Sequence, residues 1–529
     1  MMRKMFAANG TLVFVAAVVM LAAPLAAARA EQVQQAPKTP YTLAEYNAFQ
    51  ACASQTDAQA RIQSCDDFAS KFPNSVLLPL VYQTDYQAYN QLKNYPKTIE
   101  FADKFLAVPS AKMTAIPGVT TEKLAGDRLQ ALYIRAVAFN QSFNEKDPNK
   151  AAELTAARAA ALEGLKVLGE LPKPANMTDD QFVQQKKAPE VLFNYTAGSA
   201  AYDAKDYKDA IDSFNAVLAD KPDDAATSFR LGVAYLQLAA QQAAAPPATP
   251  ATPTGATPPT TPPAAAGATP PATGAAPATP ATPDAAGQSP LTNLYMNGFW
   301  ALARSIALKG PGQAQVQSYL RAQMFNYEQP ACSSLLDQQM NDLIQLAGTS
   351  ATRPAAYSLP SAADLSKVLQ SSNLLSILSD LQAGGDKGKM TWLAVCGQEI
   401  PDVVGKIISV TPSTDSIDFT VFTAATGEAI QAGTTPNLDV VVWTAPHTNT
   451  AAATTTAAPG AAAQPAQAPV QPEAARLQKG DAIKFTGTLV SYDTQPFLVH
   501  FDKCKVDPSA IPPAKKGAPK RRPRRPGRR

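Results

Sequence analysis

The stretch from residue 191 to residue 238 constrains the fold of this 529-residue chain more than any other segment. It contains two amphipathic helical segments and the start of a third, with apolar residues at helical spacing. Ala197 and Gly198 are small residues on the first segment, and Pro222 ends the second. Gly232 follows Gly198 at an interval of about 34 residues, within a similar pattern of small and apolar residues. This period predicts paired helices that cross closely at small residues and recur along the chain.

The interval, the small residues and the terminal proline together resemble the tetratricopeptide repeat (TPR). Each unit of that family buries its apolar face by stacking on its neighbours, so the resemblance implies further units in an α-solenoid. In the family, the first helix of each unit lines a concave groove that receives a peptide or a partner helix. The matching positions here are Leu192, Tyr195, Ser199, Tyr202, Asp203, Phe229, Val233, Leu236 and Gln237. Their character suits an apolar or mixed segment; the alternative is that Tyr195 and Tyr202 pack against neighbouring helices.

Helical periodicity continues on both sides of this stretch. It predicts TPR-like repeats over residues 41–242, and a continuation that caps them over residues 290–382. Residues 243–289 consist almost wholly of Ala, Pro, Thr and Gly, and we expect this insertion to be disordered. A first-helix pattern precedes the insertion and a second-helix pattern follows it. The insertion is therefore predicted to lie in the turn between two paired helices, not between domains.

Beyond Gly384 the hydrophobic period changes to the alternation that is typical of β-strands. Five strands are predicted within residues 396–508, at 403–410, 416–423, 438–444, 482–492 and 497–506. A second low-complexity insertion, residues 446–475, interrupts them. Residues 477–506, in which KGD is followed by FTGTL, resemble the closing strands of OB-fold-like domains attached to exported bacterial repeat proteins. The resemblance implies a small antiparallel five-stranded barrel, with a generic barrel or sandwich as the alternative. The predicted fold class is multidomain α + β.

Residues 1–30 have the features of a secretory signal peptide: a basic start, an apolar run and small residues at the cleavage spacing. The run is shorter than a membrane-spanning helix, and no other stretch is apolar enough to span a bilayer. We therefore expect an exported protein, periplasmic or secreted and associated with the cell envelope, that is not transmembrane after cleavage.

Export into an oxidising compartment permits disulfides, although five cysteines leave at least one unpaired. In the TPR alignment, Cys65 takes the place of a large aromatic residue and Cys52 lies at an inward position of the preceding helix. This implies a Cys52–Cys65 disulfide, or else two buried thiols. Cys396 and Cys504 lie near the two ends of the β-domain and can pair across it. Cys332 competes for Cys396, and the sequence leaves that choice open.

The net charge of +3 hides an uneven distribution, because a strongly basic tail follows an acidic body. Residues 509–529 are predicted to be disordered. The cations of the tail are Lys515, Lys516, Lys520, Arg521, Arg522, Arg524, Arg525, Arg528 and Arg529. Such a tail favours salt-dependent binding to polyanions, either envelope polymers or nucleic acid, together with the OB-like domain. Its alternative role is to keep the chain soluble.

No pattern in the sequence predicts catalysis, a metal site or a cofactor. His447 lies in a low-complexity segment, and His500 alternates with Val499 and Phe501 on a strand, so it points away from the face that they share. Residues 384–389 are glycine-rich, but they lack the first glycine and the final Ser or Thr of a phosphate-binding loop. We therefore expect a non-enzymatic scaffold without a small-molecule substrate, whose partners are other proteins.

Overall fold

The computed structural model describes residues 39–244, 288–330, 332–423, 434–446 and 469–514. The predicted signal peptide, most of both insertions, His447 and the basic tail lie outside these residues. The chain divides into two compact units, residues 1–320 with 342–357 and residues 321–341 with 358–529. The described residues contain 16 helices and a closed five-stranded barrel, which confirms a helical region followed by a β-domain. None of the helices described is both long and apolar enough to cross a membrane.

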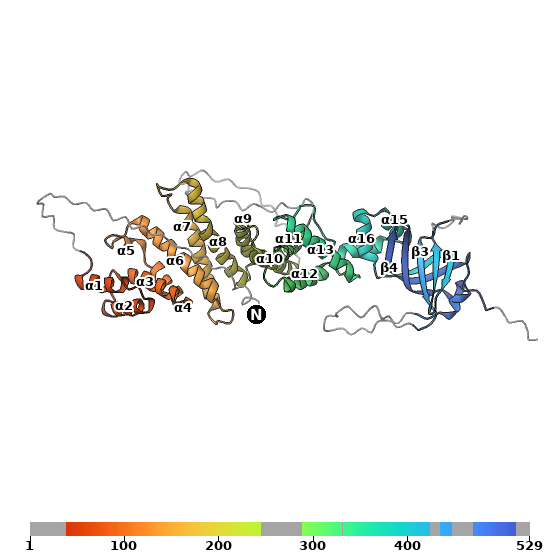
Figure 1. The fold of residues 1–529 in the computed structure, drawn as a ribbon, viewed down its shortest axis with the longest axis horizontal. Coiled ribbons are helices and arrows are strands. Elements are labelled where there is room, and N and C mark those ends of the chain that lie inside the picture. The colour runs from red at the N-terminus through yellow and green to blue at the C-terminus, as the bar shows by residue number, and fades with distance from the viewer. Residues whose placement is uncertain (1–38, 245–287, 331, 424–433, 447–468, 515–529) are drawn as a thin grey trace, which may run out of the picture. The chain divides into compact units, whose positions relative to one another are not determined.

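Eleven helices belong wholly to the first unit as far as it is described (Figure 1). They are α1 (Leu43–Ala53), α2 (Ala58–Lys71), α3 (Leu78–Gln91), α4 (Tyr95–Leu106), α5 (Ser110–Thr114), α6 (Thr121–Ser142), α7 (Lys150–Glu170), α8 (Asp179–Asp203), α9 (Tyr207–Asp220), α10 (Ala225–Ala244) and α11 (Pro290–Ala307). Two more, α12 (Gln313–Glu328) and α13 (Ser333–Thr349), contain the points where the chain passes between the units.

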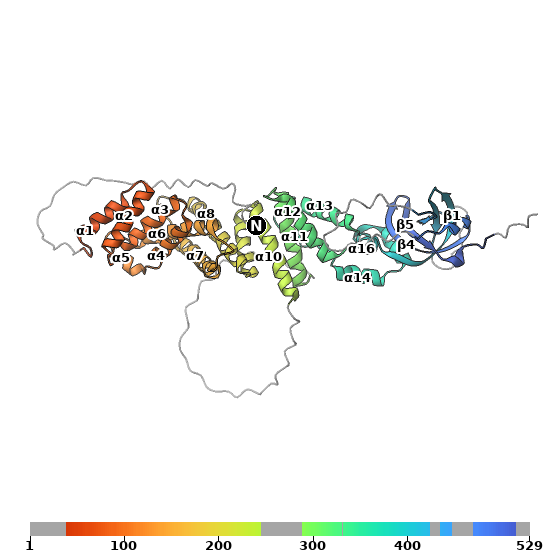
Figure 2. The same ribbon diagram turned by 90° about the horizontal axis from the view of Figure 1, so that it is seen from below.

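The helices of the first unit pack in sequence order, as Figure 1 and Figure 2 show from two sides. Each helix contacts the next along the chain, except that α6, not the short α5, is the main neighbour of α4. Alternate helices also touch: α1 contacts α3, α3 contacts α6 and α6 contacts α8. Side-chain caps set several of the helix starts, because they satisfy backbone amides that have no partner within the helix. Thr42 and Glu45 form a capping box on α1, and Thr178 and Gln181 form one on α8.

Glycines lie at two close crossings between helices. Gly198 of α8 faces Phe214 of α9, and an added Cβ atom would lie 2.8 Å from the Phe214 ring. Gly232 of α10 faces Gly298 of α11, where a Cβ atom on Gly232 would lie 3.0 Å from the Gly298 carbonyl oxygen. Since α10 and α11 pack against each other, the low-complexity insertion lies within a helix pair, as predicted.

The second unit contains α14 (Ala362–Ser371), α15 (Leu374–Ala383) and α16 (Gly385–Val395), followed by the barrel. Its strands are β1 (Glu399–Pro412), β2 (Ser416–Phe422), β3 (Leu438–Trp443), β4 (Ala482–Thr494) and β5 (Phe497–Val506). They close in the order β1-β2-β3-β5-β4. The β3–β5 pair is parallel and the other pairs are antiparallel, so the expectation of a purely antiparallel barrel was wrong for that pair. Phe419, Phe485 and Phe501 are fully buried in the core.

The helices that precede the barrel differ from the prediction. Residues 385–395 form α16, although strand periodicity was expected from Gly384 onwards. The reason is packing: Leu393, Ala394 and Val395 are buried in the same core as the barrel strands. Residues 362–382, the end of the span that was expected to cap the repeats, form α14 and α15. Their apolar residues also join the barrel core, which moves the boundary of the β-domain towards the N-terminus.

Two disulfides occur among the described residues. Cys52 and Cys65 are joined across α1 and α2, the pairing that the repeat alignment implies. Cys332 is joined to Cys396, so the Cys396–Cys504 pair considered from the sequence was wrong. Cys504 is a free thiol buried on β5, where burial raises its pKa. It occupies an apolar position in the barrel core.

His500 lies between two carboxylates on the outside of the barrel, while Val499 and Phe501 on either side of it point into the core. Its Nδ1 is 2.9 Å from Asp439 of β3, and its Nε2 is 3.0 Å from Asp493 of β4. Partial burial acts to lower the pKa of His500, but the two carboxylates together outweigh it and the pKa is raised. The protonated imidazole therefore bridges three strands, including the parallel β3–β5 pair that closes the barrel.

We expect the barrel to lose stability as the pH rises. A histidine whose folded pKa is raised contributes stability that is complete below its unfolded value of about 6.5, and this is lost as the pH passes through the folded pKa. Urea denaturation between pH 5.5 and 8.5 should show this decline, and H500Q should flatten it. A W300F background leaves Trp392 and Trp443, both in the second unit, as the fluorescent probes. Equal pH dependence in H500Q and its parent would contradict this role for His500.

Candidate partner-binding groove

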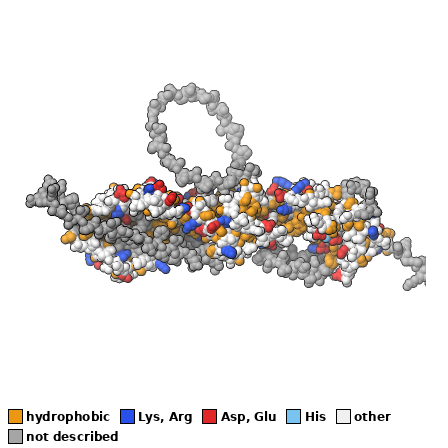
Figure 3. Space-filling model, turned by 45° about the horizontal axis from the view of Figure 1, so that its top comes forward, with side chains coloured by type: hydrophobic (Ala, Val, Ile, Leu, Met, Phe, Trp, Pro, Cys, Tyr) orange, Lys and Arg blue, Asp and Glu red, His pale blue; other side chains and the backbone are white. Residues whose placement is uncertain are grey.

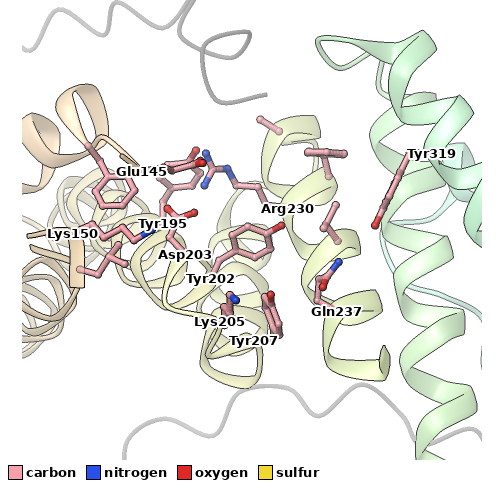
Figure 4. A pocket seen from close by; sticks show the side chains of 15 residues that line it. Glu145, Lys150, Tyr195, Tyr202, Asp203, Lys205, Tyr207, Arg230, Gln237 and Tyr319 are labelled. Atoms are coloured by element: carbon pink, nitrogen blue, oxygen red, sulfur yellow. The ribbon is translucent and has the colours of Figure 1, made fainter. Parts of the chain in front are cut away.

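A cavity of about 670 Å³ opens in the helical unit beside α8 and α10 (Figure 4). Residues from α7 to α10, from the segment before α7 and from α12 line it. They are Phe143, Glu145, Lys150, Leu154, Tyr195, Tyr202, Asp203, Lys205, Tyr207, Ala226, Phe229, Arg230, Val233, Gln237 and Tyr319. We call this cavity the α8–α10 groove. All of these residues belong to the first unit.

Most of the groove positions named from the sequence do line this cavity. The six that do are Tyr195, Tyr202, Asp203, Phe229, Val233 and Gln237. The other three are occupied in packing. Leu192 lies against the cluster around Phe193, and Leu236 is buried against Gly298 of α11. Ser199 is buried and accepts a hydrogen bond of 3.1 Å from the Arg230 guanidinium.

Aromatic rings form much of the wall. The Arg230 guanidinium lies 5.2 Å from the centre of the Tyr195 ring, a cation–π contact. The Tyr202 and Tyr207 rings meet edge to face at 5.6 Å. Burial, followed by the neighbouring Tyr207, raises the pKa of Tyr202 to about 12, and burial also raises the pKa of Tyr319. These phenols remain neutral at physiological pH and can both donate and accept hydrogen bonds.

Charges of both signs accompany the rings. Lys150, Lys205 and Arg230 are cationic, whereas Glu145 and Asp203 are anionic. In Figure 4 the side chain of Lys150, the first residue of α7, extends towards Asp203 of α8. Large rings with a few charges are the surface that binding interfaces favour, because the rings supply apolar area and the charges fix orientation.

Several lining residues were missed from the sequence. Arg230 and Gln237 lie two helical turns apart on α10, and Val233 lies between them, so helical periodicity alone was enough to find Arg230. Tyr207 is on α9, the second helix of its pair, which the repeat alignment assigns to the outer side. Tyr319 follows the long insertion, and no local pattern connects it to α8 or α10.

The described residues contain no group of His, Cys, Asp or Glu side chains arranged to hold a metal ion. His500, described above, lies on the barrel between the carboxylates of Asp439 and Asp493. Comparison with protein-family models gives no match, and comparison with curated protein sequences gives none either.

Proposed function

We propose that this protein is a non-catalytic, exported scaffold of the TPR type that binds another polypeptide in the α8–α10 groove. The observation that carries the proposal is the groove itself, which combines four tyrosines, two phenylalanines and an arginine in one cavity. The partner expected is an apolar or mixed segment, since cations and anions are both present and no basic clamp dominates. A periplasmic or envelope location agrees with the predicted signal peptide and with the two disulfides.

The assignment to a TPR-type solenoid rests on packing. Helices that contact both the next helix and the next but one are expected when helix pairs stack along an axis. The spacing of Gly198 and Gly232, each at a close crossing, adds to this. The closed order β1-β2-β3-β5-β4 likewise supports an OB-like assignment for the barrel.

The groove predicts where a partner crosslinks. A photoreactive amino acid at Gln237, which lines the groove, should capture the partner in the native envelope. The same group at Tyr46, which is 40% exposed on α1 and outside the groove, should not. Adding A226W fills the cavity without removing any core side chain and should lower the yield at Gln237 by about tenfold. Mass spectrometry of the adducts measures both effects, and the Y195A/Y202A double variant should lose the same adducts.

Circular dichroism of A226W should match that of the unaltered protein, so that a lower yield reports an occupied groove and not unfolding. Adducts of equal yield at Gln237 and Tyr46, or adducts unaffected by A226W, would remove the groove from the proposal.

The alternative of polyanion binding is less favoured by the described residues. OB-type barrels bind nucleic acids on the face of their second and third strands, and here Asp418 and Asp439 occupy the outer face of β2 and β3. Phe422 and Trp443 are half-buried, and the Trp443 indole donates to Asp502. On the face seen in Figure 3, acidic and basic side chains are interspersed among apolar ones over the helical unit. The features that support this alternative are the basic tail, which lies outside the described residues, and the OB-like pattern of the β-domain.

A further inference from the structure

The α8–α10 groove offers hydrogen-bond donors that remain open to a ligand. Tyr195, Tyr202 and Tyr207 line it and are half-buried. The phenol oxygens of Tyr202 and Tyr207 are not fully buried, and neither forms a hydrogen bond with another residue that the structure describes. Burial raises the pKa of both phenols, so they keep their protons at physiological pH and can donate. The groove therefore suits a ligand that accepts hydrogen bonds.

The charges of the groove do not form a clamp for an anion. The Arg230 guanidinium lies 5.2 Å from the centre of the Tyr195 ring and donates to Ser199 at 3.1 Å, so it is already occupied. The remaining charged residues of the lining are two lysines and two carboxylates, whose charges balance. A segment without net charge fits this balance better than an acidic segment or a chain terminus.

The open phenols also favour one backbone conformation of the ligand. An α-helix pairs its backbone carbonyls internally, so a helical partner would leave these donors to its side chains alone. A β-strand adds to the edge of a sheet, whereas helices and the segment before α7 line this groove. A polyproline II segment has no internal hydrogen bonds, exposes its carbonyl oxygens, and packs its prolines against aromatic rings.

The spacing of the two walls fits the same conformation. Tyr195 and Tyr202 are seven residues apart on α8, and Arg230 and Gln237 are seven residues apart on α10. Seven helical residues span about 10 Å, close to the roughly 9 Å over which polyproline II repeats every three residues. Figure 4 shows each pair following in the same order along its helix. Residues one polyproline II turn apart can therefore meet both tyrosine rings.

We propose that the α8–α10 groove binds a proline-rich segment of another polypeptide in the polyproline II conformation. Its prolines lie against the rings of Tyr195 and Tyr202, and its carbonyl oxygens accept from the phenols of Tyr202 and Tyr207. This inference rests on the proposed function, because it names the class of partner that the groove receives. Residues 243–289 of the chain itself are also rich in proline, so the test includes an arm that separates them from a partner.

Calorimetry with the full chain tests the conformation of the ligand. The probe is a Pro-Pro-Ala nonapeptide with an acetylated N-terminus and an amidated C-terminus, so it is neutral. A Gly-Gly-Ala nonapeptide with the same blocked ends is equally uncharged but is not preorganised, and it should bind about tenfold more weakly. A neutral amphipathic helical peptide, with leucines at i, i+3 and i+4, should also bind more weakly than the probe.

Variants of the full chain test the residues. Y202F keeps the ring and removes the hydroxyl group, so it should weaken binding of the probe by about fivefold. Y202A also removes the ring and should weaken binding further. The matched control is Y46F, since Tyr46 is 40% exposed on α1 and lies outside the groove, and its affinity should be unchanged. Replacing residues 245–287 by a Gly-Ser linker of equal length should also leave the affinity unchanged.

Several results would overturn the proposal. They are no binding of the probe at millimolar concentration, equal binding of the Gly-Gly-Ala peptide, tighter binding of the helical peptide, and unchanged affinity in Y202F. Tighter binding in the linker variant would mean that the chain's own proline-rich residues occupy the groove, and would overturn the assignment to another polypeptide. Because Y202F retains the ring, the proposal stays testable even where Y202A fails to fold.

This inference and the proposed function fail through different results. Photocrosslinks at Gln237 to a partner segment that lacks prolines would contradict the polyproline II ligand and leave the groove as the binding site. Crosslinks of equal yield at Gln237 and Tyr46 would remove the groove, and the proposed function with it.

Discussion

Replacing Asp85 by asparagine should stabilise the helical unit at pH 9 by several kcal/mol and have much less effect at pH 4. Asp85 lies on α3, is 2% exposed, and one of its carboxylate oxygens has no hydrogen-bond partner among the described residues. Burial, followed by the negative charge of Asp66, raises the pKa of Asp85 to about 8, and Lys104 opposes this only in part. The folded protein therefore holds a proton on Asp85 that the unfolded chain releases.

The sign of the pH dependence follows from that proton. An unfolded aspartate titrates near 3.9, so between about pH 4 and pH 8 the folded state binds more protons and its stability falls as the pH rises. Asparagine has nearly the same shape and does not titrate, so D85N should remove this part of the decline. Urea midpoints at pH 4, 7 and 9 measure it. D67N changes an acid on α2 whose side chain is 74% exposed, and should leave the slope as it is. Parallel curves for D85N and the unaltered protein would show that Asp85 does not titrate in this window.

Replacing Gly232 by alanine should destabilise the helical unit by about 3 kcal/mol. The new Cβ atom would lie 2.9 Å from the backbone nitrogen of Leu302 and 3.0 Å from the carbonyl oxygen of Gly298. Backbone atoms of a neighbouring helix cannot move away as a flexible side chain can, so α10 and α11 must separate. Urea denaturation at neutral pH measures the loss.

Gly126 offers the matched control, because it also lies within a helix, α6, but an added Cβ atom meets nothing within 4 Å. There, alanine has the higher helix propensity, and G126A should gain about 1 kcal/mol. If G232A lowers the free energy of unfolding and G126A raises it, the loss in G232A comes from close packing of the two helices and not from the helix propensity of alanine. A loss of less than about 1 kcal/mol in G232A would mean that α10 and α11 can separate enough to fit the new methyl group at little cost in stability.

Predictions from the sequence were most accurate for helices and strands whose apolar residues repeat at regular spacing within the element itself. Helical spacing anticipated α8 to α10 and most groove residues, and alternation anticipated five strands and the outward position of His500. It failed where tertiary packing decides. In residues 385–395, two glycines and two lysines offer a weak helical pattern, and the burial of Leu393 and Val395 against the barrel determines α16. Tyr319 reaches the groove from beyond the insertion, and the Cys332–Cys396 pair spans 64 residues. Neither has a local signal.

The crossing of Gly232 and Gly298 has a further consequence for the helical unit. Ala244 and Gln288 bound the segment between α10 and α11, and these two helices pack directly against each other through their own surfaces. A polypeptide break in that interval would leave two fragments with complementary faces. The unit thus has a natural split site, where fragment complementation can report whether the helices have assembled.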